Sequence, residues 1–278
     1  MSALQTIIDQ AWEERGVLSP SSVSQEIQEA IHLSLAALDK GENRIAEKIK
    51  GQWHIHQWLK KAILLSFRIR PNLTSPEGIG GSYDKILLKY GAWQEKDFKA
   101  ANFRAVPGAI VRHSAYVGPD VILMPSFVNV GAYIDTGTMI DSWATIGSCA
   151  QIGKNCHISA NVLIGGVLEP LQADPVIIED HCFIGAGSSI AEGVIIEQGA
   201  VLGMGVSISA STPIVDRTSG DISYGRIPAY SVVVSGSLPP RVPSSNGLQP
   251  HLSCAVIVKT VDEKTRSKTA INDLLRAV

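Results

Sequence analysis

An apolar side chain returns every six residues between Val106 and Ile214, and this pattern organises the chain. A period of six fits neither a helix of about 3.6 residues per turn nor a long strand of period two. Each unit is therefore expected to be a short strand followed by a turn. The apolar positions hold two uninterrupted phases, which are Ile110, Tyr116, Ile122, Val128, Ile134, Ile140, Ile146, Ile152, Ile158 and Ile164, then Ile178, Ile184, Ile190, Ile196, Leu202, Ile208 and Ile214.

The residue two positions before each apolar one is usually small, as at Ser126, Ala144 and Cys156. Units of this kind close into triangular coils, which stack at about 4.8 Å, the spacing of hydrogen-bonded strands. The aliphatic residue then fills the interior, and the small residue fits the tight corner. Gly and Asn gather at the turns, as at Gly147 and Asn155, where positive φ costs them little. The pattern predicts a mainly β fold, a parallel β-helix.

The flanking segments carry other patterns. Amphipathic spacing predicts helices before the repeat, and two short extended segments are expected to pair as a hairpin across Lys50-Gly51. The expected elements are helices over 2–16, 22–40 and 58–69, a hairpin of 44–49 with 52–56, a loop over 70–89, a late strand over 253–260, and a final helix over 263–278 capped by Asp262 and able to close the far end of the prism.

These elements predict three regions. Residues 1–102 form a small, mostly helical N-terminal domain, 103–238 form the β-helix, and 239–278 form a C-terminal loop, strand and capping helix. Two excursions leave the β-helix. The spacing from Ile164 to Ile178 is fourteen residues, so a loop is expected near 165–175, and a second loop near 215–226 follows Ile214. Loops that leave a rigid scaffold often carry binding groups.

Composition excludes several function classes. A net charge of −2 offers no basic field for nucleic acid. No apolar run reaches membrane-spanning length, and acidic residues such as Asp9 and Glu13 argue against a signal peptide, so a cytoplasmic location is expected. The four cysteines lack paired metal spacing and are expected to be reduced core thiols. His113 and His181 stand more than three coils apart, so no metal site is expected.

Two neighbouring residues break the generic pattern. Trp143 occupies a turn position at which Gly and Asn recur, so it packs against another subunit, lines a ligand cleft, or is simply exposed, with the first two favoured. Asp141 directly follows the inward Ile140 and should point outward. The repeat alone leaves a solvated corner carboxylate and a catalytic base both open. An apolar wall from Trp143 favours the base, since such walls tune carboxylates for proton transfer.

The segments TMIDSWATIGSCAQIGKN (138–155) and GGVLEPLQADPVIIEDHCFIGA (165–186), with HQWLKKAILLSFRI, YGRIPAYSVVVSG and the tail CAVIVKTVDEKTRSKTAINDLL, closely resemble the tetrahydrodipicolinate N-succinyltransferases. The resemblance covers nearly the whole chain. It implies a left-handed parallel β-helix of hexapeptide repeats and a homotrimer. It also implies transfer of succinyl from succinyl-CoA, as co-substrate, to the amine of a small dicarboxylate, hydrated tetrahydrodipicolinate. The expected role is in diaminopimelate and lysine biosynthesis, with no tightly bound cofactor.

The same resemblance assigns site residues. The family's substrate-binding arginine matches Arg104, and its substrate-contacting, catalytic aspartate matches Asp141. The family also has a Gly-Ala-Arg-Ser-Glu segment whose glutamate is a proposed second acid/base group. That segment ends here in Gly187-Ser188-Ser189, so both the arginine and the glutamate are missing. A mechanism with two carboxylates is therefore not carried over to this chain.

Further candidates follow from the chemistry of acyl transfer from CoA. Arg217 is a second candidate cation for the dicarboxylate, or an ordinary surface arginine. Gly165 and Gly166 are expected to floor a groove for the pantetheine arm, and Lys259 with nearby basic residues to meet the CoA phosphates or to form a solvated helix face. Two alternatives remain: a hexapeptide acyltransferase with another donor or acceptor, and a non-catalytic trimeric scaffold.

Overall fold

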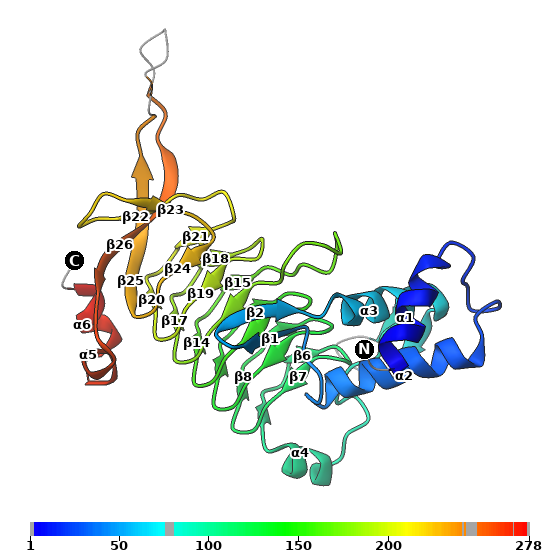
Figure 1. Cartoon of the computed structure of the whole chain (residues 1–278). Coiled ribbons are helices and arrows are strands. Elements are labelled where there is room, and N and C mark those ends of the chain that lie inside the picture. Colours follow the sequence, from blue (N-terminus) through cyan, green and yellow to red (C-terminus); the bar gives the residue numbers. More distant parts are fainter. Residues whose placement is uncertain (1–2, 76–80, 241, 243–248, 269, 277–278) are drawn as a thin grey trace.

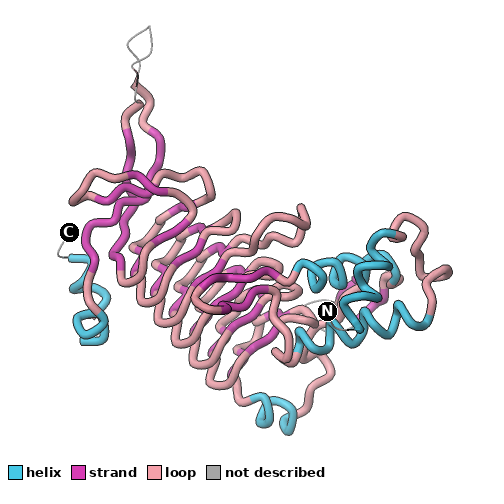
Figure 2. Tube along the Cα trace, in the orientation of Figure 1, coloured by secondary structure: helices cyan, strands magenta, loops and turns pink. Residues whose placement is uncertain are grey.

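The computed structural model describes residues 3–75, 81–240, 242, 249–268 and 270–276. Figure 1 shows an elongated molecule, with helices of the N-terminal region at one end, a prism of short strands in the middle, and a C-terminal hairpin with two short helices at the other end. The prism has three faces, each a sheet whose short strands are stacked in parallel along the axis, and one of these sheets continues into antiparallel strands at the C-terminal end (Figure 2). The predicted parallel β-helix is confirmed.

Successive strands pass from one face to the next. One six-stranded sheet has the order β24-β19-β16-β13-β10-β7, and another has the order β21-β18-β15-β12-β9-β6. The third, called here the ten-stranded sheet, has the order β23-β22-β26-β25-β20-β17-β14-β11-β8-β5. The short strands are β5 Arg104–Ala105, β6 Ile110–Val111, β7 Tyr116–Val117, β8 Ile122–Leu123, β9 Phe127–Val128, β10 Tyr133–Ile134, β11 Met139–Ile140, β12 Thr145–Ile146, β13 Gln151–Ile152, β14 His157–Ile158, β15 Leu163–Ile164, β16 Ile177–Ile178, β17 Phe183–Ile184, β18 Ser189–Ile190, β19 Ile195–Ile196, β20 Val201–Leu202, β21 Ser207–Ile208 and β24 Arg226–Ile227.

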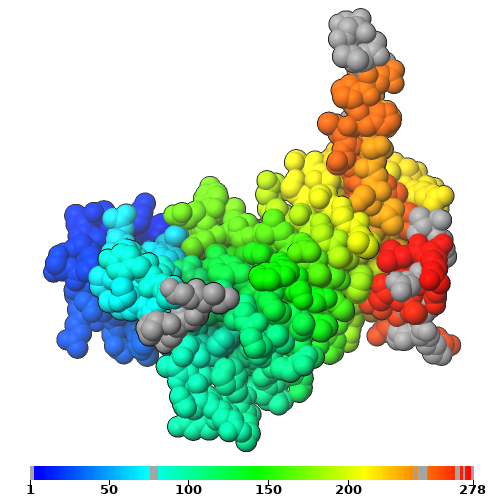
Figure 3. Space-filling model, turned by 180° about the vertical axis from the view of Figure 1, so that it is seen from behind, coloured from blue at the N-terminus to red at the C-terminus, as the bar shows by residue number. Residues whose placement is uncertain are grey.

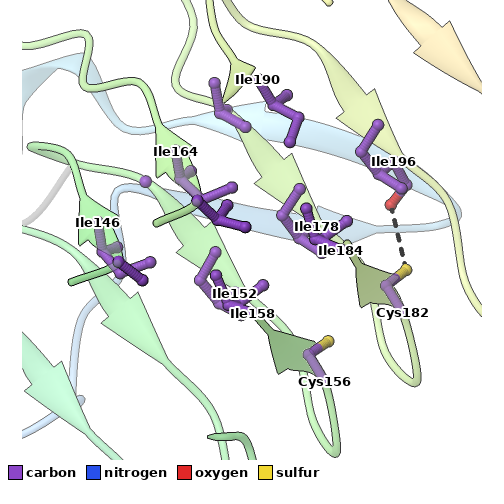
Figure 4. Close-up of a cluster of buried hydrophobic side chains, with 14 of the residues drawn as sticks. Ile146, Ile152, Cys156, Ile158, Ile164, Ile178, Cys182, Ile184, Ile190 and Ile196 are labelled. Atoms are coloured by element: carbon purple, nitrogen blue, oxygen red, sulfur yellow. Dashed lines mark hydrogen bonds between the residues drawn. The ribbon is translucent and has the colours of Figure 1, made fainter. Parts of the chain in front are cut away.

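The interior is a stack of aliphatic side chains. From Val128 onward the predicted inward residues are buried, and Figure 4 shows the isoleucines of neighbouring coils lying on one another. Cys156 and Cys182 stand at one corner of this stack, and the Cys182 thiol is directed at the carbonyl of Ile196. The four cysteines are free and buried, so the expectation of reduced core thiols is confirmed. Burial raises the pKa of the Cys149 thiol to about 12.

The inward position predicted for the start of the first phase is wrong in the first coils. The buried residues there are Val111, Val117 and Leu123, one position later than predicted, and the spacing from Leu123 to Val128 is five residues instead of six. The strand register agrees, because Leu123 pairs with Ile140. A shift of one residue exchanges the two faces of a strand, and both residues of each early strand are apolar. Tyr116 faces outward, where its ring packs on Tyr133 with centroids 4.6 Å apart.

The N-terminal region packs as a separate helical cluster against the side of the prism. The predicted helices and hairpin are confirmed as α1 Ala3–Glu13, α2 Gln25–Asp39, α3 Gln57–Ile69, β1 Ala46–Ile49 and β2 Gln52–Ile55. The Ser24 side chain accepts a hydrogen bond from the Ile27 amide and so caps α2. Buried Ile8, Ile31 and Ile63 join the helices, and the same core includes Cys149 of the prism.

The segment between this cluster and the prism contains more structure than predicted. The expected loop over 70–89 includes two paired strands, β3 Leu73–Ser75 and β4 Ser82–Asp84, while residues 76–80 lie outside the described part. A short helix, α4 Glu95–Ala101, was not predicted. Tyr90, Trp93 and Phe98 of this segment pack on the prism's core at its first coil. Aromatic side chains therefore cover the interior at this end.

The C-terminal region differs from the predicted closure. Strands β25 Ser231–Leu238 and β26 Leu252–Thr260 form an antiparallel arm that extends beyond the body (Figure 3), and β22 Ile214–Asp216 with β23 Ile222–Ser223 forms the second excursion. Ala255 and Ile257 of β26 join the prism's core. The final helix is divided into α5 Glu263–Lys268 and α6 Ile271–Arg276, and residues 269, 277 and 278 lie outside the described part. Leu274 of α6 packs on Val201 and Val232, on the outer side of the ten-stranded sheet. The helix therefore covers the sheet's outer side, and β26 covers the end of the prism.

Candidate active site

Asp141 lies at a corner of the prism, directly after β11 of the ten-stranded sheet. Ile140 points into the core and is fully buried, so Asp141 points outward. Its backbone amide donates to the Ile158 carbonyl at 2.9 Å, and its Oδ1 accepts the Ser142 amide at 2.7 Å. The neighbouring coil and the following turn thus fix the carboxylate, while Oδ2 stays available for another group.

Oδ2 of Asp141 faces a histidine from the next coil. Nε2 of His157 lies 3.7 Å from Oδ2, and the two side chains keep 42% and 31% of their surface exposed. His157 belongs to β14, where it stands in register with Met139 of β11 and with Phe183 of β17. Sequence reasoning missed this pair. The signal was present, because residues eighteen apart take the same place in successive coils, and His157 follows Met139 by eighteen.

Trp143 lies in the turn that follows Asp141. Its φ is 62°, in the left-handed region that the turn requires, and its amide donates to the Pro125 carbonyl at 2.6 Å. Its side chain is 71% exposed. Trp143 therefore points outward beside Asp141, as the repeat predicted.

Arg104 shares the ten-stranded sheet with Asp141. Arg104 pairs with Ile122, which pairs with Met139, so Arg104 stands two strands from β11, roughly 10 Å at the usual strand spacing. It is exposed and lines a cavity of about 510 Å³ together with Phe98 and Phe103. The structure thus brings a cation and a carboxylate to one face of the prism.

The remaining predicted residues lie elsewhere in the chain. Gly165 and Gly166 follow β15, at the corner between the two six-stranded sheets. A Cβ on Gly166 would overlap the backbone at Gly147 and Ser148, so close packing between coils requires this glycine. Lys259 pairs with Val232 at the far end of the ten-stranded sheet, five strand spacings or roughly 24 Å from β11. One chain does not gather these groups around Asp141.

Arg217 lies in the turn after β22, beyond Lys259. Its amide donates to the Ile257 carbonyl at 2.9 Å, and its side chain is exposed. Arg217 therefore belongs to the C-terminal end of the prism, away from Asp141 within the chain.

The 165–175 excursion packs against the N-terminal helices, and a buried lysine of α3 holds its backbone. Lys60 of α3 is fully buried, and its Nζ donates to the carbonyls of Leu171 at 2.8 Å and Ala173 at 2.7 Å. Burial lowers the pKa of the Lys60 ammonium, since the charged form loses its hydration. Leu168 of the same excursion packs on the N-terminal core. The conformation of this loop therefore depends on α3.

Within the described residues, no three His, Cys, Asp or Glu side chains are placed to hold a metal ion. None of the helices in the described part has the length and apolar character to cross a membrane.

Family models match three parts of the chain. The N-terminal model of tetrahydrodipicolinate N-succinyltransferase matches residues 3–69. A model of six bacterial transferase hexapeptide repeats matches 131–166, and a model of the hexapeptide repeat of succinyl-transferase matches 175–210. The hexapeptide models agree with the observed coils, and the expectation of a left-handed parallel β-helix is confirmed.

Curated relatives are similar over almost their entire length. Several relatives are named 2,3,4,5-tetrahydropyridine-2,6-dicarboxylate N-succinyltransferase. The one from Bartonella quintana is 60% identical to this chain, and the match covers 99% of both chains. The identity is 57% in Caulobacter vibrioides, over 99% of this chain and 100% of the relative, and 57% in Pseudoalteromonas translucida, over 100% and 99%. Among solved structures, an N-acyltransferase from Bacillus cereus matches 67% of this chain and 98% of its own at 14% identity, but its TM-score of 0.29 supports no argument.

Proposed function

Because the chain belongs to the family of tetrahydropyridine-2,6-dicarboxylate N-succinyltransferases, we propose that it transfers succinyl from succinyl-CoA to the amine of tetrahydrodipicolinate. The products are N-succinyl-2-amino-6-oxopimelate and CoA, and the step belongs to diaminopimelate and lysine biosynthesis. The observation that carries this proposal is the identity of 57% to 60% to relatives of this name over nearly the whole chain. A cytoplasmic location, where succinyl-CoA is available, is part of the proposal.

Acyl transfer to an amine needs a deprotonated nucleophile, a polarised carbonyl and two substrates held in line. We assign the amine to the surroundings of Asp141, whose Oδ1 is fixed by the Ser142 amide and whose Oδ2 faces outward. Arg104 binds a carboxylate of the acceptor, because its planar guanidinium can donate two parallel hydrogen bonds. Trp143 provides an apolar wall next to the reacting groups.

The remaining groups act in CoA binding in this proposal. The 165–175 excursion with Gly165 and Gly166 borders the pantetheine arm, and Lys259 meets the phosphates. Arg217 is a further cation for acidic groups. Since these residues lie away from Asp141 within one chain, the proposal requires a homotrimer in which neighbouring subunits complete each site.

The assay mixes the purified protein with succinyl-CoA and tetrahydrodipicolinate and follows the release of free thiol. Thiol release that depends on both substrates is the expected result. Faster release with acetyl-CoA would favour an acyltransferase with another donor, and release with a different amine acceptor would favour another acceptor. A folded protein that releases no thiol with any of these substrates would favour the non-catalytic scaffold.

A further inference from the structure

His157 is an exception among the outward side chains of the ten-stranded sheet. Register pairing aligns these positions into one column along the prism. Between Arg104 at its start and Val201 near its end, the column contains only apolar side chains apart from His157; these are Ile122, Met139 and Phe183. The imidazole stands between Met139 and Phe183, and its centroid lies 5.3 Å from the Phe183 ring. A titratable ring is thus held between apolar neighbours.

The ring has one acidic group within ion-pair distance in the described part of the chain. There, the carboxylate of Asp141 is the one acidic group within 4.0 Å of His157, with 3.7 Å between Nε2 and Oδ2. Ion pairs and hydrogen bonds at catalytic sites often shorten only when substrate binds. With 42% of the side chain exposed, the ring remains open to a ligand.

The chemistry of the pair fits a need that the chain otherwise leaves unmet. Ser189 stands where the family has a glutamate, and a serine hydroxyl does not take up a proton at neutral pH. Asp141 has one oxygen committed to the Ser142 amide. Imidazole is the side chain that gains and loses a proton between pH 5 and 8 without special surroundings. His157 is therefore well suited to receive the proton of the amine.

We propose that His157 and Asp141 act as one proton-accepting pair, with His157 as the general base of the succinyl transfer; this rests on the function proposed above. The amine nitrogen forms a bond to the thioester carbonyl carbon, and its proton moves to the imidazole nitrogen that does not face Asp141. Asp141 holds the ring and stabilises the imidazolium. When the tetrahedral intermediate collapses, the C–S bond breaks, and the imidazolium returns the proton to the CoA sulfur.

The test compares the parent with His157→Gln and with His54→Gln, a control on the exposed face of β2. The rate of CoA release is measured from pH 5.5 to 9 with both substrates varied. His157→Gln should lower kcat by roughly 10²-fold or more, the usual contribution of a general base, and leave KM for succinyl-CoA within about twofold. The fall in kcat/KM that the parent shows at acidic pH should disappear. His157→Ala should regain activity when free imidazole is added.

The outcomes separate the two proposals. A parent that releases no CoA overturns the proposed function and the pair together. An active parent whose His157→Gln variant keeps its kcat overturns the pair alone. A variant that loses activity but keeps the parent's pH profile, with no recovery by imidazole in His157→Ala, shows a structural role for His157 and also overturns the pair. The unfolding temperature of each variant is also compared with that of the parent. Equal unfolding temperatures exclude misfolding as the cause of lost activity.

Discussion

At the scale of single residues, Asp141 is positioned by backbone groups that do not depend on its charge. Its Oδ1 accepts the Ser142 amide, and an asparagine side chain can accept the same bond. Asp141→Asn should therefore keep the fold and CoA binding while kcat falls by roughly 10² to 10⁴. CoA release and circular dichroism check this expectation. Full activity in the variant would remove Asp141 from the mechanism.

The missing family residues give a second prediction at this scale. Gly187 has a φ of 70° and open space around an added Cβ, so an arginine there costs about 1 kcal/mol of backbone strain without a clash. Ser189 lies on β18, on another face and two coils from Asp141. Gly187→Arg with Ser189→Glu should raise the rate, or leave it unchanged, through contacts across a subunit boundary. A large loss of rate in this double variant would contradict the prediction. A parent that is inactive, and a double variant that is active, would favour the non-catalytic scaffold.

At the scale of the element, each coil relies on its inward side chain. Ile152 is fully buried, and its strand partners are Ile134 and Ile178 in the coils on either side. Ile152→Asp should unfold the central coils, because a buried charge without a partner costs several kcal/mol. Leu163→Asp is the matched control, since Leu163 is exposed on β15. Melting curves that are equal for the two variants would show that the inward phase is misassigned.

The 165–175 excursion gives a prediction that joins two elements. Lys60→Met leaves the carbonyls of Leu171 and Ala173 without their buried donor, which should cost about 1–3 kcal/mol and speed amide exchange in the excursion. If the excursion borders CoA, KM for succinyl-CoA should rise more than kcat falls. Lys61→Met is the control, because Lys61 pairs with Asp9 near the surface and should cost less than about 1 kcal/mol. Unchanged exchange in Lys60→Met would contradict the coupling.

Several of these elements could be predicted from the sequence, and the exceptions have physical reasons. From Ile134 to Ile208 the residue directly after each inward position is small or polar, as at Asp135, Gly147 and Ser159, so periodicity identified the inward residue. In Ile122-Leu123 both residues are apolar, and only the stacking of coils decides which one is buried. The short helix α4 has a capping box at Gln94 but too few turns for a clear period. The eighteen-residue spacing from Met139 marks His157 in the sequence, but its contact with Asp141 lies across coils and is shown only by the structure.

At the scale of the whole molecule, the proposed function needs more than one chain to complete each site. Arg104, Asp141 and Trp143 lie on or beside the ten-stranded sheet, while Lys259 lies roughly 24 Å away along it and Gly165 lies at another corner. The exposed Trp143 next to Asp141 offers an apolar contact for a neighbouring subunit. A closed trimer would place a second prism against this face and bring another chain's groups to Asp141.

The expected oligomer is therefore a stable homotrimer, with active sites between neighbouring subunits. Sedimentation velocity at micromolar concentration should give one species near three times the 29.7 kDa chain mass. Mixing Asp141→Asn with an inactive variant of Lys259 or Arg217, after reversible dissociation, should restore part of the activity, because some sites would combine two intact halves. A stable monomer with full activity would contradict the shared site, since one chain would then hold every group that the reaction needs.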